Sequence, residues 1–488
     1  MSGLNSEGHR AYLEAIQRFG DAGRAEGARQ QELAGGFLPV SEHLRMLDPD
    51  VVLIVGPRGS GKTEIVRILT EGVNFDAILS YAPAIRLPQG KVTWVKAFPI
   101  GREGFETIGY RKFVNSSSPN SRAMQELWFS YLVRVLASDL ADVDRNVVEP
   151  LLAVEPSDPV AMHHRFSKLG TKVVESLDHL DSELERSNSY IFATYDELET
   201  LADSDWSMVD SGVGSLMSFW ATYARRWKRI RAKLFIRTDL YERNLKSGEA
   251  DLVKLAAGRI ELTWNDQALY SLLLKRLGNC GNGLGEYVRG IKKLQWTEDA
   301  VFGWIPKLSS SQEAKPVIER LMGVYMGPNA KKGMVFRWLL DHVRDGRGRA
   351  YPRPFVRLIE HAARLELGEI SGDNKLKLLE PSSIRRSLDT VSQEHVTQSY
   401  SEWPWLADIK DALAQNPLVP YAEKDILKLL RTLEGQTKNN KPDLDGRELL
   451  DYLLELGILR RRSENRIDVP DLFLAGMGLK RKGGVIRR

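Results

Sequence analysis

The segment GPRGSGKT, from Gly56 to Thr63, carries the residue types and spacing with the clearest chemistry. It fits the pattern G-x-x-x-x-G-K-[ST] at every fixed position. Positive φ at its glycines would let backbone N–H groups close around phosphate oxygens. Lys62 is expected to reach the β- and γ-phosphates, and Thr63 to hold Mg²⁺ through its hydroxyl. The segment therefore predicts a site for ATP and Mg²⁺. The residues expected to line it are Gly56, Pro57, Arg58, Gly59, Ser60, Gly61, Lys62, Thr63 and Glu64.

The flanking residues supply the elements that such a loop needs. Val51–Val55 is an unbroken apolar run, typical of a buried strand. Glu64–Thr70 has helical apolar spacing, and the positive end of that helix dipole would point at the bound anion. A chance glycine-rich turn is the alternative, but it does not explain a strand before the loop and a helix after it.

A second motif pairs two carboxylates. The apolar run Tyr190–Tyr195 is followed by Asp196 and Glu197. Side chains at the carboxyl end of a central parallel strand face the ligand crevice. Asp196 is expected to bind Mg²⁺ through its water shell, and Glu197 to polarise an attacking water. An ordinary strand end with surface acids is the alternative, and the P-loop upstream favours the catalytic interpretation.

Several cations are candidates for contacts to the γ-phosphate. Arg237 ends a predicted strand, Ala232–Thr238, beside the Asp196 strand, and is a sensor candidate. An ion pair with Asp239 or Glu242 is the alternative for it. Arg353 begins a helix and is a candidate second sensor. The alternative for Arg353 is an ordinary exposed arginine at the start of a helix. Lys254 and Arg259 are weaker candidates for a group that reaches a neighbouring subunit.

Composition sets broad limits. The 488 residues suffice for two to four domains, and 42% hydrophobic with 27% charged residues is typical of a globular protein. A net charge of +4 is too small over this length to predict nucleic-acid binding by itself. Cys280 is the one cysteine, so the chain has no internal disulfide framework, which suits a reducing cytoplasm. We expect Cys280 to be an ordinary loop thiol. We see no signal-peptide pattern and no apolar run of membrane-spanning length, so we expect a soluble cytoplasmic protein without a membrane partner.

The pattern divides the chain into consecutive regions. Residues 1–37 are a polar helical segment, and residues 38–265 are the P-loop core, with a helical insertion at about 99–188. Residues 266–370 are predicted to be an all-helical lid, in which Glu298–Ile305 is one of the helices. Residues 371–403 are polar and are predicted to be a helix pair or a linker, and residues 404–488 a final domain.

The final domain has the order of a winged helix. Two helices, Tyr421–Leu433 and Asp445–Leu456, precede two short strands, Ile458–Arg462 and Arg466–Val469. Gly457 is expected to stop the second helix. Basic residues gather on the hairpin and the tail, at Arg460, Arg461, Arg462, Arg466, Lys480, Arg481 and Lys482. They suit duplex DNA phosphates, or a protein-docking wing with a solvated basic tail, and the sequence leaves both open.

This order of motifs resembles the AAA+ and STAND branch of P-loop ATPases. It is similar to origin-recognition-type ATPases and to bacterial P-loop ATPases found in phage-defence loci. The resemblance covers residues 38–370 and, less firmly, 405–488. It implies an α/β P-loop NTPase core with a parallel sheet and helices on both faces, a helical lid and a C-terminal winged helix. In YPRPFVRLIEHA, Arg353 takes the place of the family's lid arginine. Arg237-Thr238 stands where many AAA+ members have Asn, which favours a switch over a motor-like ring.

The resulting hypothesis is an ATP-binding and ATP-hydrolysing switch that forms a homo-oligomer or changes its partner with nucleotide state. The partner would be a protein such as a defence effector. One alternative is an ATP-dependent DNA initiator or loader that uses the winged helix. Another is a small-molecule kinase, which the Asp196–Glu197 pair and the large lid argue against, since a kinase gains nothing from an activated water.

Overall fold

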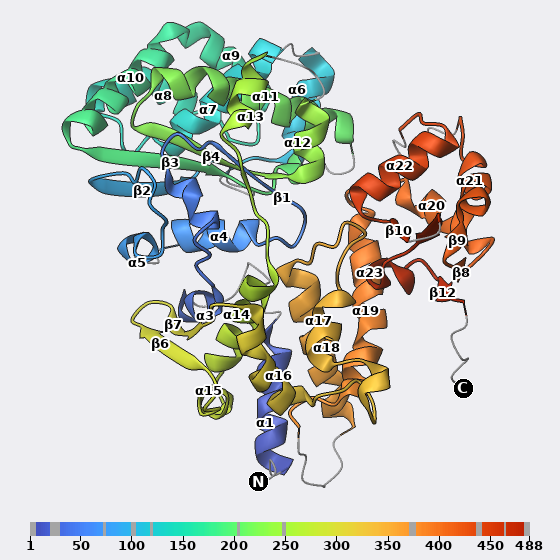
Figure 1. The fold of residues 1–488 in the computed structure, drawn as a ribbon. Helices are drawn as coiled ribbons and strands as arrows, with labels where there is room; N and C mark the ends of the chain where they lie inside the picture. The colour runs from blue at the N-terminus through green and yellow to red at the C-terminus, as the bar shows by residue number, and fades with distance from the viewer. Residues whose placement is uncertain are drawn as a thin grey trace. The chain divides into compact units, whose positions relative to one another are not determined.

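The computed structural model describes most of the chain (Figure 1). The described residues are 6–19, 30–71, 75–98, 104–117, 121–202, 205–245, 250–369, 377–435, 442–462 and 465–482. Contacts divide the chain into two compact units. One is Pro39–Thr263, and the other joins Met1–Leu38 to Trp264–Arg488. The N-terminal segment thus belongs with the C-terminal half of the chain.

The first unit is built on a five-stranded parallel sheet in the order β2-β3-β4-β1-β5. The strands are β1 Leu53–Gly56, β2 Lys91–Lys96, β3 Ser189–Tyr195, β4 Ile230–Arg237 and β5 Ile260–Glu261. Every residue of β1 and β4 is buried, as expected for central strands covered on both faces. Because β4 lies between β1 and β3, the carboxyl ends of these three strands meet at one edge of the sheet.

Helices cover both faces of this sheet, which confirms the predicted α/β core. α4 Lys62–Thr70 and α5 Phe75–Leu79 lie on one face, and α11 Trp206–Arg226 lies on the other (Figure 1). The insertion adds helices on the α11 side. They are α6 Thr107–Ser117, α7 Ser121–Val135, α8 Asp142–Leu152, α9 Pro159–Leu169 and α10 Thr171–Arg186. Trp128 and Phe129 of α7 share one apolar core with Phe219 and Trp220 of α11. The unit also contains η1 His43–Leu47, η2 Leu198–Ala202, α12 Thr238–Leu245 and α13 Ala250–Ala257.

The second unit is mainly helical. Its helices before residue 400 are α1 Ser6–Gln17, α3 Gln30–Gly36, α14 Asp266–Gly278, α15 Leu284–Arg289, α16 Lys315–Met322, α17 Val335–Asp341, α18 Pro352–Gly368 and α19 Pro381–Ser399, with short turns η3 Ser311–Ala314 and η4 Ala330–Lys332. α18 packs against both α1 and α19. In the described residues, no helix is long and apolar enough to cross a bilayer.

The prediction of an all-helical lid is wrong. β6 Gln295–Asp299 and β7 Gly303–Lys307 form an antiparallel hairpin where Glu298–Ile305 was expected to be a helix. The Asp299 side chain accepts hydrogen bonds from two backbone N–H groups of the connecting turn, and Gly303 adopts φ 67°. Trp296 packs so closely on Gly278 that a Cβ there would lie 2.6 Å from the indole ring. Turn chemistry and tryptophan packing therefore override the weak helical pattern.

Of the two alternatives for residues 371–403, a helix pair or a linker, the described part agrees better with helix, because α19 spans Pro381–Ser399. α19 packs along α18 and buries Ile384, Val391 and Val396. Its many serines made it look like a solvent-exposed segment. Ser387 and Ser392 are instead fully buried, and small side chains allow close helix packing. Residues 371–376 lie outside the described residues.

The C-terminal part combines short helices with a small sheet. Its elements are α20 Leu406–Ala414, β8 Leu418–Val419, β9 Tyr421–Ala422, α21 Glu423–Arg431, α22 Gly446–Leu456, β10 Arg460–Arg462, β11 Arg466–Asp468, α23 Asp471–Leu474 and β12 Lys480–Arg481. β10, β11 and β9 form an antiparallel sheet in that order, and β12 pairs with β8. Gly457 ends α22 at φ 78°, as predicted, and the Asp445 side chain caps the start of this helix. The sequence pattern missed β9, because its two residues were assigned to the start of the following helix.

Candidate nucleotide-binding site

The loop between β1 and α4 has the geometry that its glycines require. Gly59 and Gly61 adopt φ 79° and 100°, which side chains rarely allow. Gly56 does not share this conformation, which corrects the expectation for it, and space is the reason for glycine there. A Cβ at Gly56 would lie 2.5 Å from the Ser60 hydroxyl oxygen and 3.2 Å from Leu262 Cβ. Ser60 is thereby held against the end of β1.

Lys62 is buried within the same loop. Its ammonium donates hydrogen bonds to the carbonyl oxygens of Gly56, at 2.7 Å, and Pro57, at 3.0 Å. The ammonium therefore points along the loop and not out to solvent. Pro57, Arg58, Thr63 and Glu64 are partly exposed around it. A lysine in this position is able to exchange backbone carbonyls for phosphate oxygens, which bind it more strongly because they are charged.

Asp196 and Thr63 come together although they are far apart in sequence. The Thr63 hydroxyl and the backbone N–H of Glu197 donate hydrogen bonds to the Asp196 carboxylate. Within the described residues, Asp196 Oδ2 is shielded from solvent and accepts no hydrogen bond. Burial, with a smaller contribution from the charge of Glu199, raises the pKa of Asp196 to about 6 against the opposing effects of Thr63 and Lys62. A buried carboxylate oxygen with no donor, beside a threonine hydroxyl, fits a hard cation such as Mg²⁺.

Glu197 occupies an unusual backbone conformation. Its φ of 57° lies in the left-handed region, and its side chain is exposed. The Glu197 carbonyl accepts hydrogen bonds from the backbone N–H and the hydroxyl of Thr200, at 3.0 and 2.8 Å. Non-glycine residues in this region cluster at functional sites. The backbone turns sharply here, directly after the Asp196 carboxylate.

Arg237 forms the ion pair that was the alternative to a sensor role. Its guanidinium binds Asp239 in a bidentate manner, at 3.0 and 2.9 Å, and only 2% of its side chain is exposed. It also lies 3.8 Å from a carboxylate oxygen of Glu199. In the sheet, Arg237 is the register partner of Gly56, the first residue of the phosphate loop. The ion pair thus holds the arginine at the correct edge of the sheet, and its role towards phosphate stays a prediction.

The other predicted cations are less informative. Arg353 lies exposed in the first turn of α18, in the second unit, so its sensor role stays a prediction. Arg259 pairs with Glu261 at 3.0 Å, and the Lys254 side chain lies outside the described residues. Burial raises the pKa of Cys280 to about 12, as expected for an inert loop thiol.

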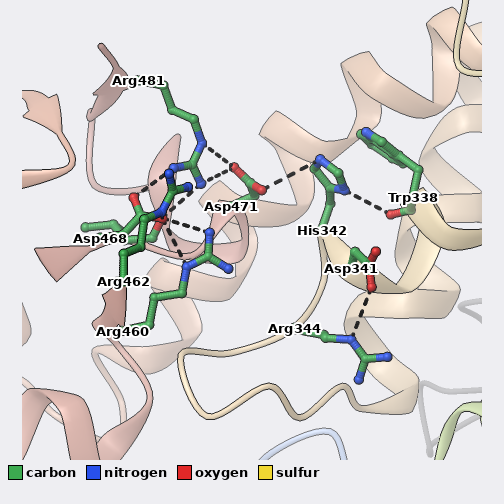
Figure 2. Close-up of polar contacts among 10 residues, drawn as sticks. Trp338, Asp341, His342, Arg344, Arg460, Arg462, Asp468, Asp471 and Arg481 are labelled. Carbon is green, nitrogen blue, oxygen red and sulfur yellow. Dashed lines mark hydrogen bonds and ion pairs between the residues drawn. The ribbon is translucent and has the colours of Figure 1, made fainter. Parts of the chain in front are cut away.

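The basic residues of the C-terminal part are largely paired with acids. Asp468 is fully buried and binds Arg460, Arg462 and Arg481 at 2.7 to 2.9 Å (Figure 2). Arg481 also binds Asp471 at 2.7 Å. Burial would raise the pKa of Asp468, but these arginines outweigh it and lower the pKa.

Two more of the cations on this surface have partners, and Lys480 is exposed. Arg461 contacts Glu423 at 2.7 Å, and the Lys482 ammonium donates to the Pro420 carbonyl at 3.1 Å. The exposed side chains of α22 include Glu448, Asp451 and Glu455. The predicted basic surface therefore carries much less free positive charge than the sequence indicates.

One residue near the site was missed by the sequence pattern. Glu199 stands two positions after the DE pair, in the segment DELET, and its side chain lies near both Asp196 and Arg237. Three carboxylates within four residues were a visible signal. The short turn that brings Glu199 back towards the sheet was not predictable from composition.

The chain matches no known family model and no curated protein. Among solved structures, it is similar to the ORC2 protein of Aeropyrum pernix, solved in ADPNP–ADP complexes. The two share 13% sequence identity over 89% of this chain and 92% of that one, with a TM-score of 0.32.

Proposed function

We propose that this protein is a P-loop ATPase of the AAA+/STAND type that acts as a nucleotide-dependent switch. The observation that supports this most strongly is the contact between Thr63 and Asp196 beside Lys62, with one Asp196 oxygen buried and without a donor. The phosphate loop after β1 and the proposed metal-binding carboxylate after β3 thus lie at the same edge of the sheet. Lys62 would bind phosphate, and Thr63 with Asp196 would hold Mg²⁺, which neutralises charge on the phosphates.

The hydrolytic step would use the residues that follow these ligands. Glu197 is the proposed general base for water, and its exposed side chain is accessible to a water molecule. Arg237 is the proposed γ-phosphate sensor, held at the end of β4 by Asp239. Arg353 is the proposed lid sensor, and Lys254 or Arg259 would act in a neighbouring subunit of a homo-oligomer. A carboxylate pair poised for water favours hydrolysis over transfer to a small-molecule acceptor, so the kinase alternative is not adopted.

The C-terminal part is proposed to be the output domain of the switch. The order α20, β9, α21, α22, β10, β11 and the sheet order β10-β11-β9 support a winged helix. We expect nucleotide state to alter how this domain binds its partner or which oligomer forms.

The test is a comparison of Glu197→Gln with wild type by size-exclusion chromatography with light scattering, with and without ATP and Mg²⁺. We expect Glu197→Gln to bind ATP, to lose hydrolysis and to accumulate a larger species. Lys62→Ala is the control that should not respond to ATP. A mass independent of nucleotide in every variant would refute the switch, and hydrolysis unaffected by Glu197→Gln would refute the assignment of the base.

The pairing of arginines with carboxylates in the C-terminal domain favours a protein over duplex DNA as the partner of this domain. Arg460, Arg462 and Arg481 share the buried Asp468, and α22 exposes acidic side chains where duplex DNA would repel them. The test is duplex DNA binding at 50 and 200 mM salt. DNA binding that is tight and falls steeply with salt would support the initiator or loader alternative instead.

A further inference from the structure

The backbone segment after Asp196, residues 197–202, forms a compact turn that we term the acidic turn. It begins with the left-handed Glu197, closes through the Thr200 bonds to the Glu197 carbonyl and continues as η2. Leu198 and Leu201 are buried beneath it. The turn is therefore an ordered element, and its position determines where its carboxylates lie.

Glu199 lies on this turn near Arg237, the proposed γ-phosphate sensor, and near Asp196, the proposed Mg²⁺ ligand. Its carboxylate is 3.8 Å from Arg237 Nη1, and its side chain is 32% exposed. Its negative charge also reaches Asp196, where it contributes to the raised pKa. Asp239 binds Arg237 from the start of α12, and Glu199 approaches the same guanidinium from the turn that follows Asp196. Through Glu199, the turn that follows β3 contacts the cation that ends β4.

Helix α6 of the insertion holds the acidic turn in place. The Thr107 hydroxyl donates to the Thr200 carbonyl at 3.0 Å, and Arg111 donates to the Ala202 carbonyl at 3.1 Å. Tyr110 of the same helix donates to the Met208 carbonyl at 3.0 Å, at the start of α11. Carbonyls at the end of a short helical turn have no partner within it, so donors from outside stabilise them. The insertion is thus hydrogen-bonded to the segment that carries Glu197 and Glu199.

We propose that Glu199 is a positioning residue that orients Arg237 towards the nucleotide, and that α6 sets its place, so that the helical insertion controls the rate of hydrolysis. This inference rests on the proposed ATPase function. It assigns a role to an insertion that otherwise only covers the sheet. It also implies that a ligand or subunit that displaces α6 changes hydrolysis without contact to the phosphates.

The first test is Glu199→Gln, with Glu185→Gln as a matched control. Glu185 is a half-exposed carboxylate on α10 that pairs with Lys228 away from the acidic turn. We expect kcat to fall about 10- to 100-fold in Glu199→Gln, the range for groups that orient a functional residue, while the KM for ATP with Mg²⁺ stays within about twofold. The control should behave as wild type. Equal Tm values for the two variants would show that folding is not the cause.

A double-mutant cycle separates positioning from a general structural effect. Arg237→Lys keeps the charge but loses the planar fork that binds two carboxylates. If Glu199 acts through Arg237, the double variant Glu199→Gln with Arg237→Lys should have nearly the same kcat as Arg237→Lys alone. Losses that multiply, or an unchanged kcat in Glu199→Gln, would overturn the positioning role.

Thr107→Val tests the contribution of α6, because it removes the hydroxyl donor and keeps the shape. We expect a severalfold lower kcat with unchanged KM, whereas Arg122→Ala, on α7 with its own Glu126 partner, should have no effect. A wild-type kcat in Thr107→Val would refute control by the insertion. If Lys62→Ala and Asp196→Asn abolish hydrolysis while Glu199→Gln leaves kcat unchanged, only this inference fails. If the wild-type protein neither binds nor hydrolyses ATP, the proposed function itself fails.

Discussion

Replacing Asp196 with Asn should stabilise the ligand-free protein while it removes the response to Mg²⁺. Burial raises the pKa of this carboxyl from 3.8 to about 6, so the folded protein at pH 7.5 holds a charge that its surroundings disfavour. Asp196 Oδ2 is shielded from solvent and accepts no hydrogen bond within the described residues, and this explains why the ionised carboxylate is destabilising. Asparagine keeps the shape and the acceptor for Thr63 but carries no charge.

The magnitude follows from linkage between protonation and folding. A rise from 3.8 to about 6 corresponds to about 3 kcal/mol of free energy of unfolding, which sets the upper limit of the gain. Because the folded-state pKa is raised, the wild-type protein is relatively stabilised below pH 3.8 and loses that contribution as the pH rises through about 6. The stability difference between Asp196→Asn and wild type should therefore grow between pH 5 and pH 7.5. Each 1 kcal/mol shifts Tm by about 2–4 °C for a domain of 150–250 residues.

Thermal unfolding at pH 5 and pH 7.5, with and without ATP and Mg²⁺, measures both effects. We expect Asp196→Asn to unfold several degrees above wild type at pH 7.5 without ligand, and about half that difference to remain at pH 5, which lies between the two pKa values. With ligand, the part of the wild-type shift that depends on Mg²⁺ should be lost in the variant. A variant that is less stable than wild type at pH 7.5 would refute the reasoning, because the charge would then be stabilising. A full Mg²⁺-dependent shift in the variant would refute the metal assignment.

Three further substitutions test other parts of the structure. Gly56→Ala should lower the free energy of unfolding by about 1–3 kcal/mol and weaken ATP binding, because its Cβ would meet the Ser60 hydroxyl at 2.5 Å. Denaturant unfolding and ATP titration measure the two effects. A Gly56→Ala variant that binds ATP with wild-type affinity would contradict this prediction. Asp468→Asn should cost about 3–5 kcal/mol by leaving three arginines without their shared carboxylate, whereas the exposed Asp451→Asn should be nearly neutral; similar Tm values for both would contradict the buried cluster. Ser387→Val should cost about 1–3 kcal/mol through crowding between α18 and α19 and loss of a hydrogen bond to an α18 carbonyl, and an unchanged Tm would show that the helices separate easily.

The local elements of the site were predictable because short-range patterns determine them. The β1–loop–α4 order and the strand before Asp196 follow from apolar runs, glycine positions and helical spacing. The stop of α22 at Gly457 follows from one residue that tolerates the left-handed conformation. In each case, the signal lies within about ten residues of the element.

Features that depend on distant partners were not predictable. The β6–β7 hairpin depends on Trp296 packing against Gly278, and the serine-rich α19 became a core helix because α18 lies beside it. The hairpin arginines suggested an open basic surface, but Asp468 and Glu423 pair with five arginines of the C-terminal part. Glu199 joined the site because a turn of six residues returns its side chain to Arg237.

Cys280 has a practical consequence for measuring motion in this protein. Burial raises the pKa of the Cys280 thiol from 9.0 to about 12, so its thiolate is rarer at neutral pH than that of an exposed cysteine. Maleimide dyes and spin labels react with thiolates, so Cys280 should be labelled more slowly than cysteines introduced at exposed positions. The native sequence is then a suitable background for a pair of reporter labels, one placed at Glu185 in the first unit and one at the exposed Glu286 in the second. Such a pair would record changes in the distance between the two units as ATP binds and is hydrolysed.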